Sequence, residues 1–187
     1  MGQQASLQPG VASSALDIVN YYRSHYGDGT DAHYLKGKLA IVTGGNSGIG
    51  TETCKALAYA GCRVILCSRS VSNAEEAVKT EIKELGLGGY SVENAEELIT
   101  IKQLDLNCMQ SIRKFAEEFI KDFPNDSIDY LVLNAGIMAL PNKEYTADGF
   151  EKQIGVNHFG HAFLTSLLMG RLGSQVRDCQ RIDLLLI

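Results

Sequence analysis

The run Thr43–Gly50, TGGNSGIG, places four glycines within eight residues. It follows the apolar stretch 39–42, which predicts a buried strand, and it leads into residues 51–58, which predict a helix. Glycines at such a turn let a pyrophosphate approach the backbone and let the helix pack tightly on the strand. Strand, turn and helix therefore favour a phosphate-binding site over a purely structural turn. Its candidate cofactor-binding residues are Gly44, Asn46, Ser47, Gly48, Ile49 and Gly50.

The end of the next predicted strand reads Leu66-Cys67-Ser68-Arg69-Ser70 and contains no acid. In dinucleotide-binding folds, an Asp or Glu about 20 residues beyond the glycine turn accepts the hydrogen bond of the ribose 2′-OH. Arg69 would instead pair with a 2′-phosphate, so NADP(H) is favoured over NAD(H) as the cofactor. The alternative is that Arg69 is an ordinary solvated arginine.

Asn157 falls within an apolar stripe of a predicted long helix that reaches about Leu172, and we expect its side chain to face the core. The stripe comprises Phe150, Ile154, Asn157, His161, Leu164 and Leu168. A buried amide without partners costs about 1–3 kcal/mol, so Asn157 should be hydrogen-bonded, either to a neighbouring strand or within a catalytic site. His158 and His161 lie three residues apart, but no cysteine or carboxylate completes a metal site, and we expect no metal.

The elements that would position these residues alternate along the chain. Strands are expected at 39–42, 62–67, 98–104, 128–133 and 182–187, with helices between them. The buried face of the first of these helices is expected to comprise Ile49, Thr53, Ala56, Leu57 and Ala60. Ser72 is expected to cap the second helix through a capping box with Glu75. This alternation predicts an α/β fold with a doubly wound parallel sheet in the order 3-2-1-4-5.

Length and composition are those of one soluble domain. The chain has 187 residues, of which 45% are hydrophobic and 21% are charged, and its net charge is −5. This acidic balance, with no basic run, argues against nucleic acid as a partner. No apolar run approaches the roughly 20 residues of a membrane span, and the five cysteines form no C-x-x-C pair. We therefore expect reduced thiols and a cytoplasmic protein.

Residues 1–34 form an N-terminal appendage in this interpretation, with one short helix, and residues 35–187 form the dinucleotide-binding domain. The start, Met1-Gly2-Gln3-Gln4-Ala5-Ser6, matches the N-myristoylation pattern, although a leader that matches by chance fits equally well. A single acyl chain on Gly2 would give only weak, reversible peripheral contact with a membrane.

Taken together, these residues resemble the short-chain dehydrogenase/reductase family, whose glycine pattern is T-G-x-x-x-G-x-G. Further matches follow in order at Leu104-Asp105-Leu106, at Leu133-Asn134-Ala135-Gly136 and at 148–161, DGFEKQIGVNHFGH, which resembles the retinol-dehydrogenase-like branch. The resemblance covers about residues 36–172. It implies that Asp105 contacts adenine, that Asn134, Ala135 and Gly136 line the cofactor site, and that Asn157 belongs to the catalytic set.

The family transfers a hydride between a nicotinamide and a carbonyl or alcohol carbon, and uses a Ser and a Tyr-x-x-x-Lys beyond the position of Asn157. No serine stands at the end of the expected fifth strand, and no Tyr-x-x-x-Lys follows Asn157, so we expect a chain that is truncated after the fifth strand and lacks turnover. One Tyr-x-x-x-Lys occurs, at Tyr34–Lys38, but it precedes the first strand and should lie at the wrong end of the sheet.

Three functions remain open at this point. The first is an NADP-dependent oxidoreductase acting on a small carbonyl or alcohol substrate, represented by an incomplete chain. The second is a non-catalytic module that binds NADP(H) or a partner protein. The third is a product that folds poorly. An exposed apolar edge at Leu184-Leu185-Leu186-Ile187 would also promote self-association.

Overall fold

The computed structural model describes residues 15–26, 35–78, 80 and 98–173. Within these residues, four parallel strands form one sheet in the order β3-β2-β1-β4. The strands are β1 (Leu39–Thr43), β2 (Arg63–Ser68), β3 (Ile99–Gln103) and β4 (Tyr130–Val132). This arrangement confirms the predicted α/β fold with a doubly wound parallel sheet. The fifth strand, predicted at 182–187, lies outside the described residues.

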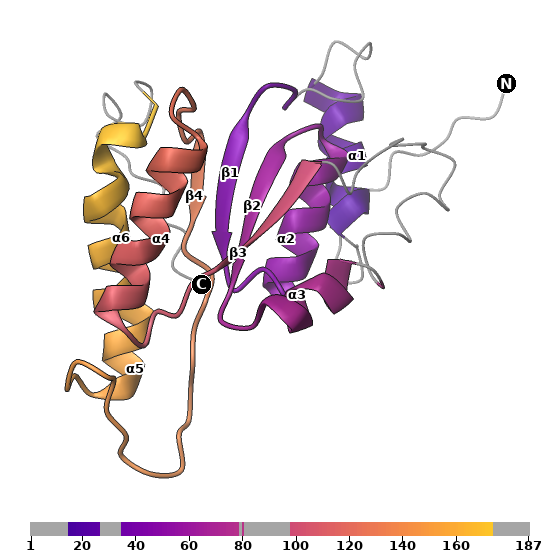
Figure 1. Ribbon diagram of the computed structural model, residues 1–187. Coiled ribbons are helices and arrows are strands. Elements are labelled where there is room, and N and C mark those ends of the chain that lie inside the picture. The colour runs from indigo at the N-terminus through magenta and orange to yellow at the C-terminus, as the bar shows by residue number, and fades with distance from the viewer. Residues whose placement is uncertain (1–14, 27–34, 79, 81–97, 174–187) are drawn as a thin grey trace, which may run out of the picture.

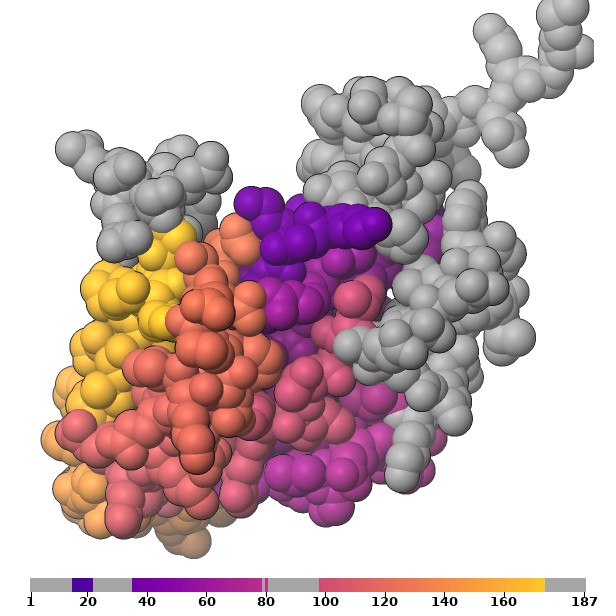
Figure 2. Space-filling model, turned by 45° about the horizontal axis from the view of Figure 1, so that its top comes forward, coloured from indigo at the N-terminus to yellow at the C-terminus, as the bar shows by residue number. Residues whose placement is uncertain are grey.

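Helices cover both faces of the sheet, as Figure 1 shows. On one face lie α2 (Gly48–Tyr59) and α3 (Val71–Ala77), which contact β1, β2 and β3. On the other lie α4 (Met109–Asp122) and α6 (His161–Leu168), which pack against each other. The short α5 (Lys152–Ile154) and a π-helical segment, Gly155–Gly160, lead into α6, and the 3-10 turn Met169–Arg171 follows it. Figure 2 shows the same division, with the α4 and α6 layer on the left and the α2 and α3 layer on the right.

Each layer has its own hydrophobic core. Between the sheet and the α4–α6 layer, Phe115, Phe119, Leu164 and Leu168 are fully buried. Between the sheet and the α2–α3 layer, the side chains are smaller and include Cys54, Ala58 and Ala74. Small residues let α2 approach the sheet closely, which brings the N-terminus of that helix directly to the carboxyl end of β1.

The N-terminal helix α1 (Ala15–Tyr26) lies against α2. Leu16 packs onto the core beneath α2, and the Tyr59 hydroxyl donates a 3.0 Å hydrogen bond to Asn20 Oδ1. The predicted short helix is therefore present, and it is docked on the dinucleotide-binding fold.

Two local predictions about the helices were wrong. In α2 the buried face comprises Thr51, Cys54 and Ala58, whereas Ile49 is 58% exposed. The glycine turn causes this rotation, because Gly50 must face the backbone of Gly44 and the residues one and two turns later follow it inward.

The cap of α3 also differs. Ser70, and not Ser72, caps this helix, since its hydroxyl accepts a 3.3 Å hydrogen bond from the Asn73 amide. Ser70 has the extended backbone that a cap requires, because it follows β2 directly.

The predicted long helix is present, but it is not uniform. Its middle, Gly155–Gly160, has π-helical hydrogen bonding and contains Asn157. Phe150 lies before the helix, which starts at Lys152, and the predicted stripe is buried only in its later part. Phe150 and Ile154 are 40% and 48% exposed, whereas His161, Leu164 and Leu168 are buried.

Candidate functional site

A pocket of about 690 Å³ opens at the carboxyl ends of the strands. It lies where the strand order reverses between β1 and β4, which is where doubly wound sheets bind their ligands. Every site residue predicted from the sequence lines this pocket except Gly48. The lining thus joins segments that are far apart in the chain: the glycine turn, Arg69, Asp105, the Asn134–Gly136 segment and Asn157.

The glycine turn is held in a shape that side chains would prevent. Gly44 and Gly48 have φ angles of 65° and 54°, in the left-handed region that glycine favours. A Cβ atom at Gly50 would lie 2.1 Å from the Gly44 carbonyl oxygen, so helix α2 begins in direct contact with the turn. Ser47 makes no side-chain cap on α2, which leaves the first backbone N–H groups of the helix available to an anion.

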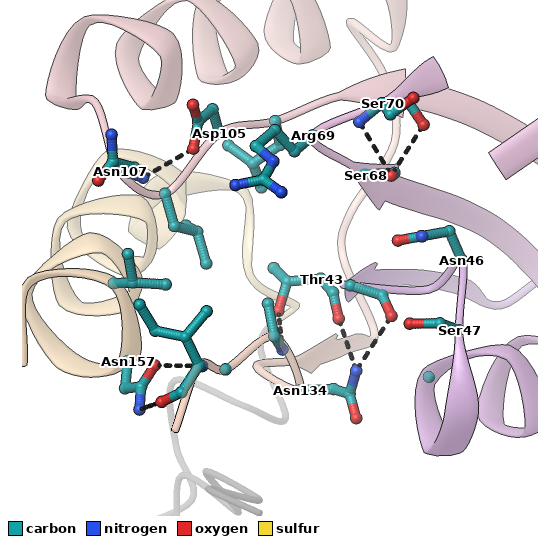
Figure 3. A pocket seen from close by; sticks show the side chains of 18 of the residues that line it. Thr43, Asn46, Ser47, Ser68, Arg69, Ser70, Asp105, Asn107, Asn134 and Asn157 are labelled. Atoms are coloured by element: carbon teal, nitrogen blue, oxygen red, sulfur yellow. Dashed lines mark hydrogen bonds between the residues drawn. The ribbon is translucent and has the colours of Figure 1, made fainter. Parts of the chain in front are cut away.

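Asn134 and Thr43 fix the opposite wall of the pocket (Figure 3). The side-chain nitrogen Nδ2 of Asn134 donates to the carbonyl oxygens of Thr43 and Gly44, at 2.9 and 3.2 Å. The Thr43 hydroxyl accepts a 3.0 Å hydrogen bond from the Ala135 amide. These bonds join the end of β1 to the segment after β4, so the glycine turn and the Asn134–Gly136 wall are held as one unit.

Arg69 points into the pocket from the end of β2 (Figure 3). Its side chain is exposed, and its guanidinium makes no hydrogen bond or ion pair with any residue that the structure describes. The backbone beneath it is nevertheless fixed, because the buried Ser68 hydroxyl donates to the Ser70 carbonyl oxygen and accepts from the Ser70 amide. The site thus presents an unneutralised cation on an ordered turn.

Asp105 lies on the same side of the pocket, directly after β3. Its Oδ1 accepts a 2.9 Å hydrogen bond from the Asn107 amide, and its own amide donates to Ser111 Oγ at 3.0 Å. The turn is therefore rigid, and Asp105 remains at the pocket surface with acceptor capacity to spare. Such a carboxylate can accept a hydrogen bond from an exocyclic amine.

The Asn157 side chain is hydrogen-bonded to the backbone of the segment that follows Gly136. Its Oδ1 accepts a 2.9 Å hydrogen bond from the Ile137 amide, and its Nδ2 donates to the Ile137 carbonyl at 2.8 Å. Both functional groups of the side chain are thus used on the backbone of one residue, Ile137, which lies in the segment after β4 and not in a strand. The bonds are structural, as one of the two interpretations of the sequence expected, but their partner is not a strand. A catalytic role for Asn157 stays a prediction.

Two polar residues of this region were not singled out as site residues from the sequence. Thr43 is the first residue of the glycine run, and it is 1% exposed at the end of an otherwise apolar strand. His161 was considered as part of the apolar stripe and as half of a metal pair, but not as a site residue. It is 2% exposed, and its Nε2 lies 2.9 Å from Thr43 Oγ1. The sequence held a signal for each of them. Thr43 is a polar residue at the end of an apolar strand, and His161 is a histidine within an apolar helical stripe.

The remaining candidate groups lie away from this chemistry. Lys38 pairs with Asp129 at the amino-terminal edge of the sheet, at 3.0 Å, so it lies at the end opposite the pocket as expected; Tyr34 lies outside the described residues. No group of three or more His, Cys, Asp or Glu that could hold a metal occurs among the described residues. Among the same residues, no helix has the length and apolarity to cross a membrane.

Three cysteines of the described residues are buried in the protein. Cys54, Cys62 and Cys67 are free thiols and buried. Burial raises the pKa of Cys54 and of Cys62 to about 12 each, and it raises the pKa of Cys67 as well. These three are therefore protonated and unreactive at neutral pH. Cys179 lies outside the described residues.

The proteins that are similar to this chain belong to the family that the motifs indicated, and solved structures share its fold. The sequence profile of the family described as short chain dehydrogenase matches residues 38–177. Mouse retinol dehydrogenase 14 is 40% identical over 147 residues, which are 78% of this chain and 43% of that protein. Mouse retinol dehydrogenase 11 is 44% identical over 138 residues, which are 74% of this chain and 40% of that protein. The chain thus spans less than half the length of these relatives.

Solved structures show the same architecture. A protein from Mycobacterium paratuberculosis, described as uncharacterized, superposes with a TM-score of 0.59 at 36% identity, over 76% of this chain and 45% of that one. A metagenomic short-chain oxidoreductase, solved in complex with NADP, superposes with a TM-score of 0.56 at 24% identity, over 73% of this chain and 57% of that one. The second likeness is evidence of fold alone.

Proposed function

The chain belongs to the short-chain dehydrogenase family, on its retinol-dehydrogenase-like branch, and from this premise we propose that it binds NADP(H) in the pocket at the carboxyl ends of its strands. The observation that carries the proposal is the guanidinium of Arg69, which has no partner among the described residues and lies at the end of β2, where an NAD-binding site would place an acid. The family is an oxidoreductase family, so the reaction in which the cofactor would take part is the interconversion of a carbonyl and an alcohol.

Each part of the pocket has a counterpart in the cofactor. The Gly44–Gly50 turn and the first N–H groups of α2 suit the pyrophosphate, because they are close-packed and uncapped. Arg69 suits the 2′-phosphate, with which an arginine forms strong, often bidentate hydrogen bonds. Asp105 suits the exocyclic amine of adenine. The Asn134–Gly136 wall and Asn157 then border the nicotinamide half.

The bound cofactor would give or accept a hydride at a substrate carbon. A proton must move as well, and in this family a Tyr-x-x-x-Lys beyond the position of Asn157 moves it. No such sequence follows Asn157 in the 187-residue chain. We therefore expect this chain, by itself, to bind the cofactor without turning over a substrate.

The substrate class follows only by analogy with the relatives. Their names indicate retinol, so an apolar alcohol or aldehyde of retinoid type is the candidate, with a steroid as the alternative. The absence of turnover is checked by incubating the purified chain with NADPH and a panel of such carbonyl compounds while absorbance at 340 nm is followed. Steady NADPH consumption above the protein-free rate would show that the proton-transfer machinery is present after all.

A variant of Arg69 tests cofactor choice directly. The dissociation constants of NADPH and NADH are measured by fluorescence titration for the wild type and for Arg69→Ala. Loss of a charge-assisted phosphate contact costs about 1.5–3 kcal/mol, so NADPH should bind roughly 10–100-fold more weakly to the variant while NADH changes little.

Arg113→Ala is the matched control, since Arg113 lies over the Phe163 ring, away from this pocket. The control should bind both cofactors as the wild type does. Equal weakening of NADPH and NADH by Arg69→Ala, or no effect on either, would refute the assignment of the 2′-phosphate to Arg69.

A non-catalytic module that binds NADP(H) or a partner remains the second candidate. It is favoured by one specific feature, namely that the residues proposed to bind the cofactor line one pocket, whereas no Tyr-x-x-x-Lys follows Asn157 in the 187 residues. Cofactor binding with no turnover, in a stably folded chain isolated at its 187-residue mass, would support this candidate. A chain that aggregates and that NADPH does not stabilise would instead identify a poorly folding product.

A further inference from the structure

A buried histidine joins the two walls of the pocket. His161 is 2% exposed and does not itself line the pocket. Its Nε2 lies 2.9 Å from Thr43 Oγ1 at the end of β1, and its Nδ1 lies 3.0 Å from the Asn157 carbonyl oxygen. Both partners do line the pocket. The imidazole therefore connects the strand that precedes the glycine turn with the π-helical segment that carries Asn157.

The partners determine which nitrogen of His161 carries the proton. A carbonyl oxygen only accepts, so Nδ1 must be protonated in order to bond to Asn157. In the neutral ring Nε2 is then an acceptor, and the Thr43 hydroxyl donates to it. The hydroxyl has a single proton, for which the Val132 carbonyl oxygen at 3.4 Å competes, and we assign this proton to the shorter contact with Nε2 at 2.9 Å. The same hydroxyl accepts from the Ala135 amide at 3.0 Å.

The bonds close into a ring around Gly136. Thr43 holds the Ala135 amide, Asn157 holds both polar groups of Ile137, and His161 links Thr43 to Asn157. The backbone Ala135–Ile137 completes the circuit. Removal of the imidazole opens this ring at the point where the sheet meets the helix.

We infer that His161 is a positioning residue that keeps the Ala135–Ile137 wall of the pocket in its cofactor-binding shape, through its neutral Nδ1–H form. This inference rests on the proposed NADP(H) site as far as cofactor affinity is concerned. The shape of the wall itself is a property of the chain without cofactor. His161 thereby acts through Thr43 and Asn157 and needs no contact with cofactor or substrate.

The surroundings of His161 keep it neutral. Burial lowers its pKa below 6.5, and the nearby His158 on the same helix acts in the same direction, while the bond to the Asn157 carbonyl opposes them. β1 contains no titratable side chain, and β4 contains only Tyr130. The side chains that α4 buries, Ile112, Phe115, Ala116 and Phe119, are apolar. No charged group of the described residues is bonded to the imidazole.

The tautomer is the first test, and it is read from the wild-type chain. Long-range ¹H–¹⁵N correlation spectra of the imidazole rings at pH 8 distinguish Nδ1–H from Nε2–H. Free histidine prefers Nε2–H, whereas we expect His161 to show Nδ1–H. The Nε2–H form at His161 would overturn the inference, and this outcome does not depend on whether any variant folds.

Two variants then test the effect on the wall by hydrogen exchange of the Ala135 and Ile137 amides. His161→Phe retains an aromatic ring but removes both hydrogen bonds, and it should raise both exchange rates about tenfold relative to amides of β3, which pairs with neither β1 nor β4. His161→Gln offers Thr43 an acceptor again and should recover part of the protection at Ala135. Unchanged exchange at both amides in His161→Phe would overturn the inference.

NADPH titration of the same variants separates this inference from the proposed function. If the wild type binds NADPH, we expect His161→Phe to bind it about tenfold more weakly, with His161→Gln between the two. If the wild type does not bind NADPH while His161→Phe still loosens the two amides, the positioning role stands and the cofactor assignment fails. Equal NADPH affinity of wild type and His161→Phe would refute the link between the wall and the cofactor.

Discussion

Gly50 and Gly44 show at the scale of single residues why a glycine motif predicted this site. The Cβ position of Gly50 lies 2.1 Å from the Gly44 carbonyl oxygen and 2.6 Å from Asn134 Nδ2. The same Asn134 amide nitrogen bonds to the carbonyl of Gly44. A side chain at Gly50 would therefore push apart the turn, the helix and the opposite wall at once.

We expect Gly50→Ala to abolish measurable NADPH binding and to lower the free energy of unfolding by roughly 2 kcal/mol, because overpacking against backbone cannot be relieved by a rotamer change. Denaturant titration and NADPH titration of the variant check this. Gly170→Ala is the matched control, since its Cβ would meet nothing within 4 Å and its φ is not positive. Wild-type affinity in Gly50→Ala would contradict the account of the turn.

Protonation of His161 provides a second prediction at this scale. Its pKa in the folded chain is below 6.5, so the unfolded chain takes up this proton first as the pH falls. The stability contributed by neutral His161 is therefore fully present above about pH 6.5 and is lost as the pH falls toward the folded pKa. Urea unfolding at pH 8 and pH 5.5 should show a smaller pH-dependent loss for His161→Phe than for the wild type. Equal losses in the two proteins would exclude His161 as their source.

At the scale of elements, the sequence identified strands and motifs better than helix faces. Residues 39–42, 62–67 and 98–104 were assigned as strands within one or two residues of β1, β2 and β3, because each is a short segment rich in apolar and β-branched residues. The rotation of α2 was missed, since the glycine turn fixes it and apolar spacing does not. The π-helical form of Gly155–Gly160 has no periodic signature, so the bonds of Asn157 and His161 required the structure.

The outer edge of β4 is only partly paired among the residues that the structure describes, and this leads to a prediction about self-association. In the described residues its outer edge carries only the isolated bridge between Ile128 and Leu172, and Tyr130 is 38% exposed there. An incompletely paired edge of this kind is a template for pairing with another chain. We therefore expect the 187-residue chain to self-associate.

Light scattering coupled to size-exclusion chromatography checks this across a range of concentrations. The apparent mass should rise above 20.3 kDa as the concentration increases. A constant monomer mass at high concentration would show that the edge is protected.

At the scale of the whole molecule, the residues that the glycine motif, the second strand and the family resemblance indicated lie around one pocket. The parallel topology explains this, because the carboxyl ends of β1 to β4 meet at a single edge of the sheet. Sequence reasoning could place Arg69, Asp105 and Asn134 at that edge from their position after a strand. It could not show that Arg69 has no partner among the described residues, or that Asn157 uses both of its polar groups to bind Ile137, since both depend on tertiary contacts.

The central claim is that this chain folds into a pocket that selects NADP(H). The thermal unfolding midpoint of the purified 187-residue chain, measured against increasing NADPH and NADH, tests folding and binding together. Ligand at about 100 times its dissociation constant stabilises a fold by about 2.7 kcal/mol, so the midpoint should rise steadily with NADPH and much less with NADH at equal concentration. A cooperative transition that neither cofactor moves would contradict the claim.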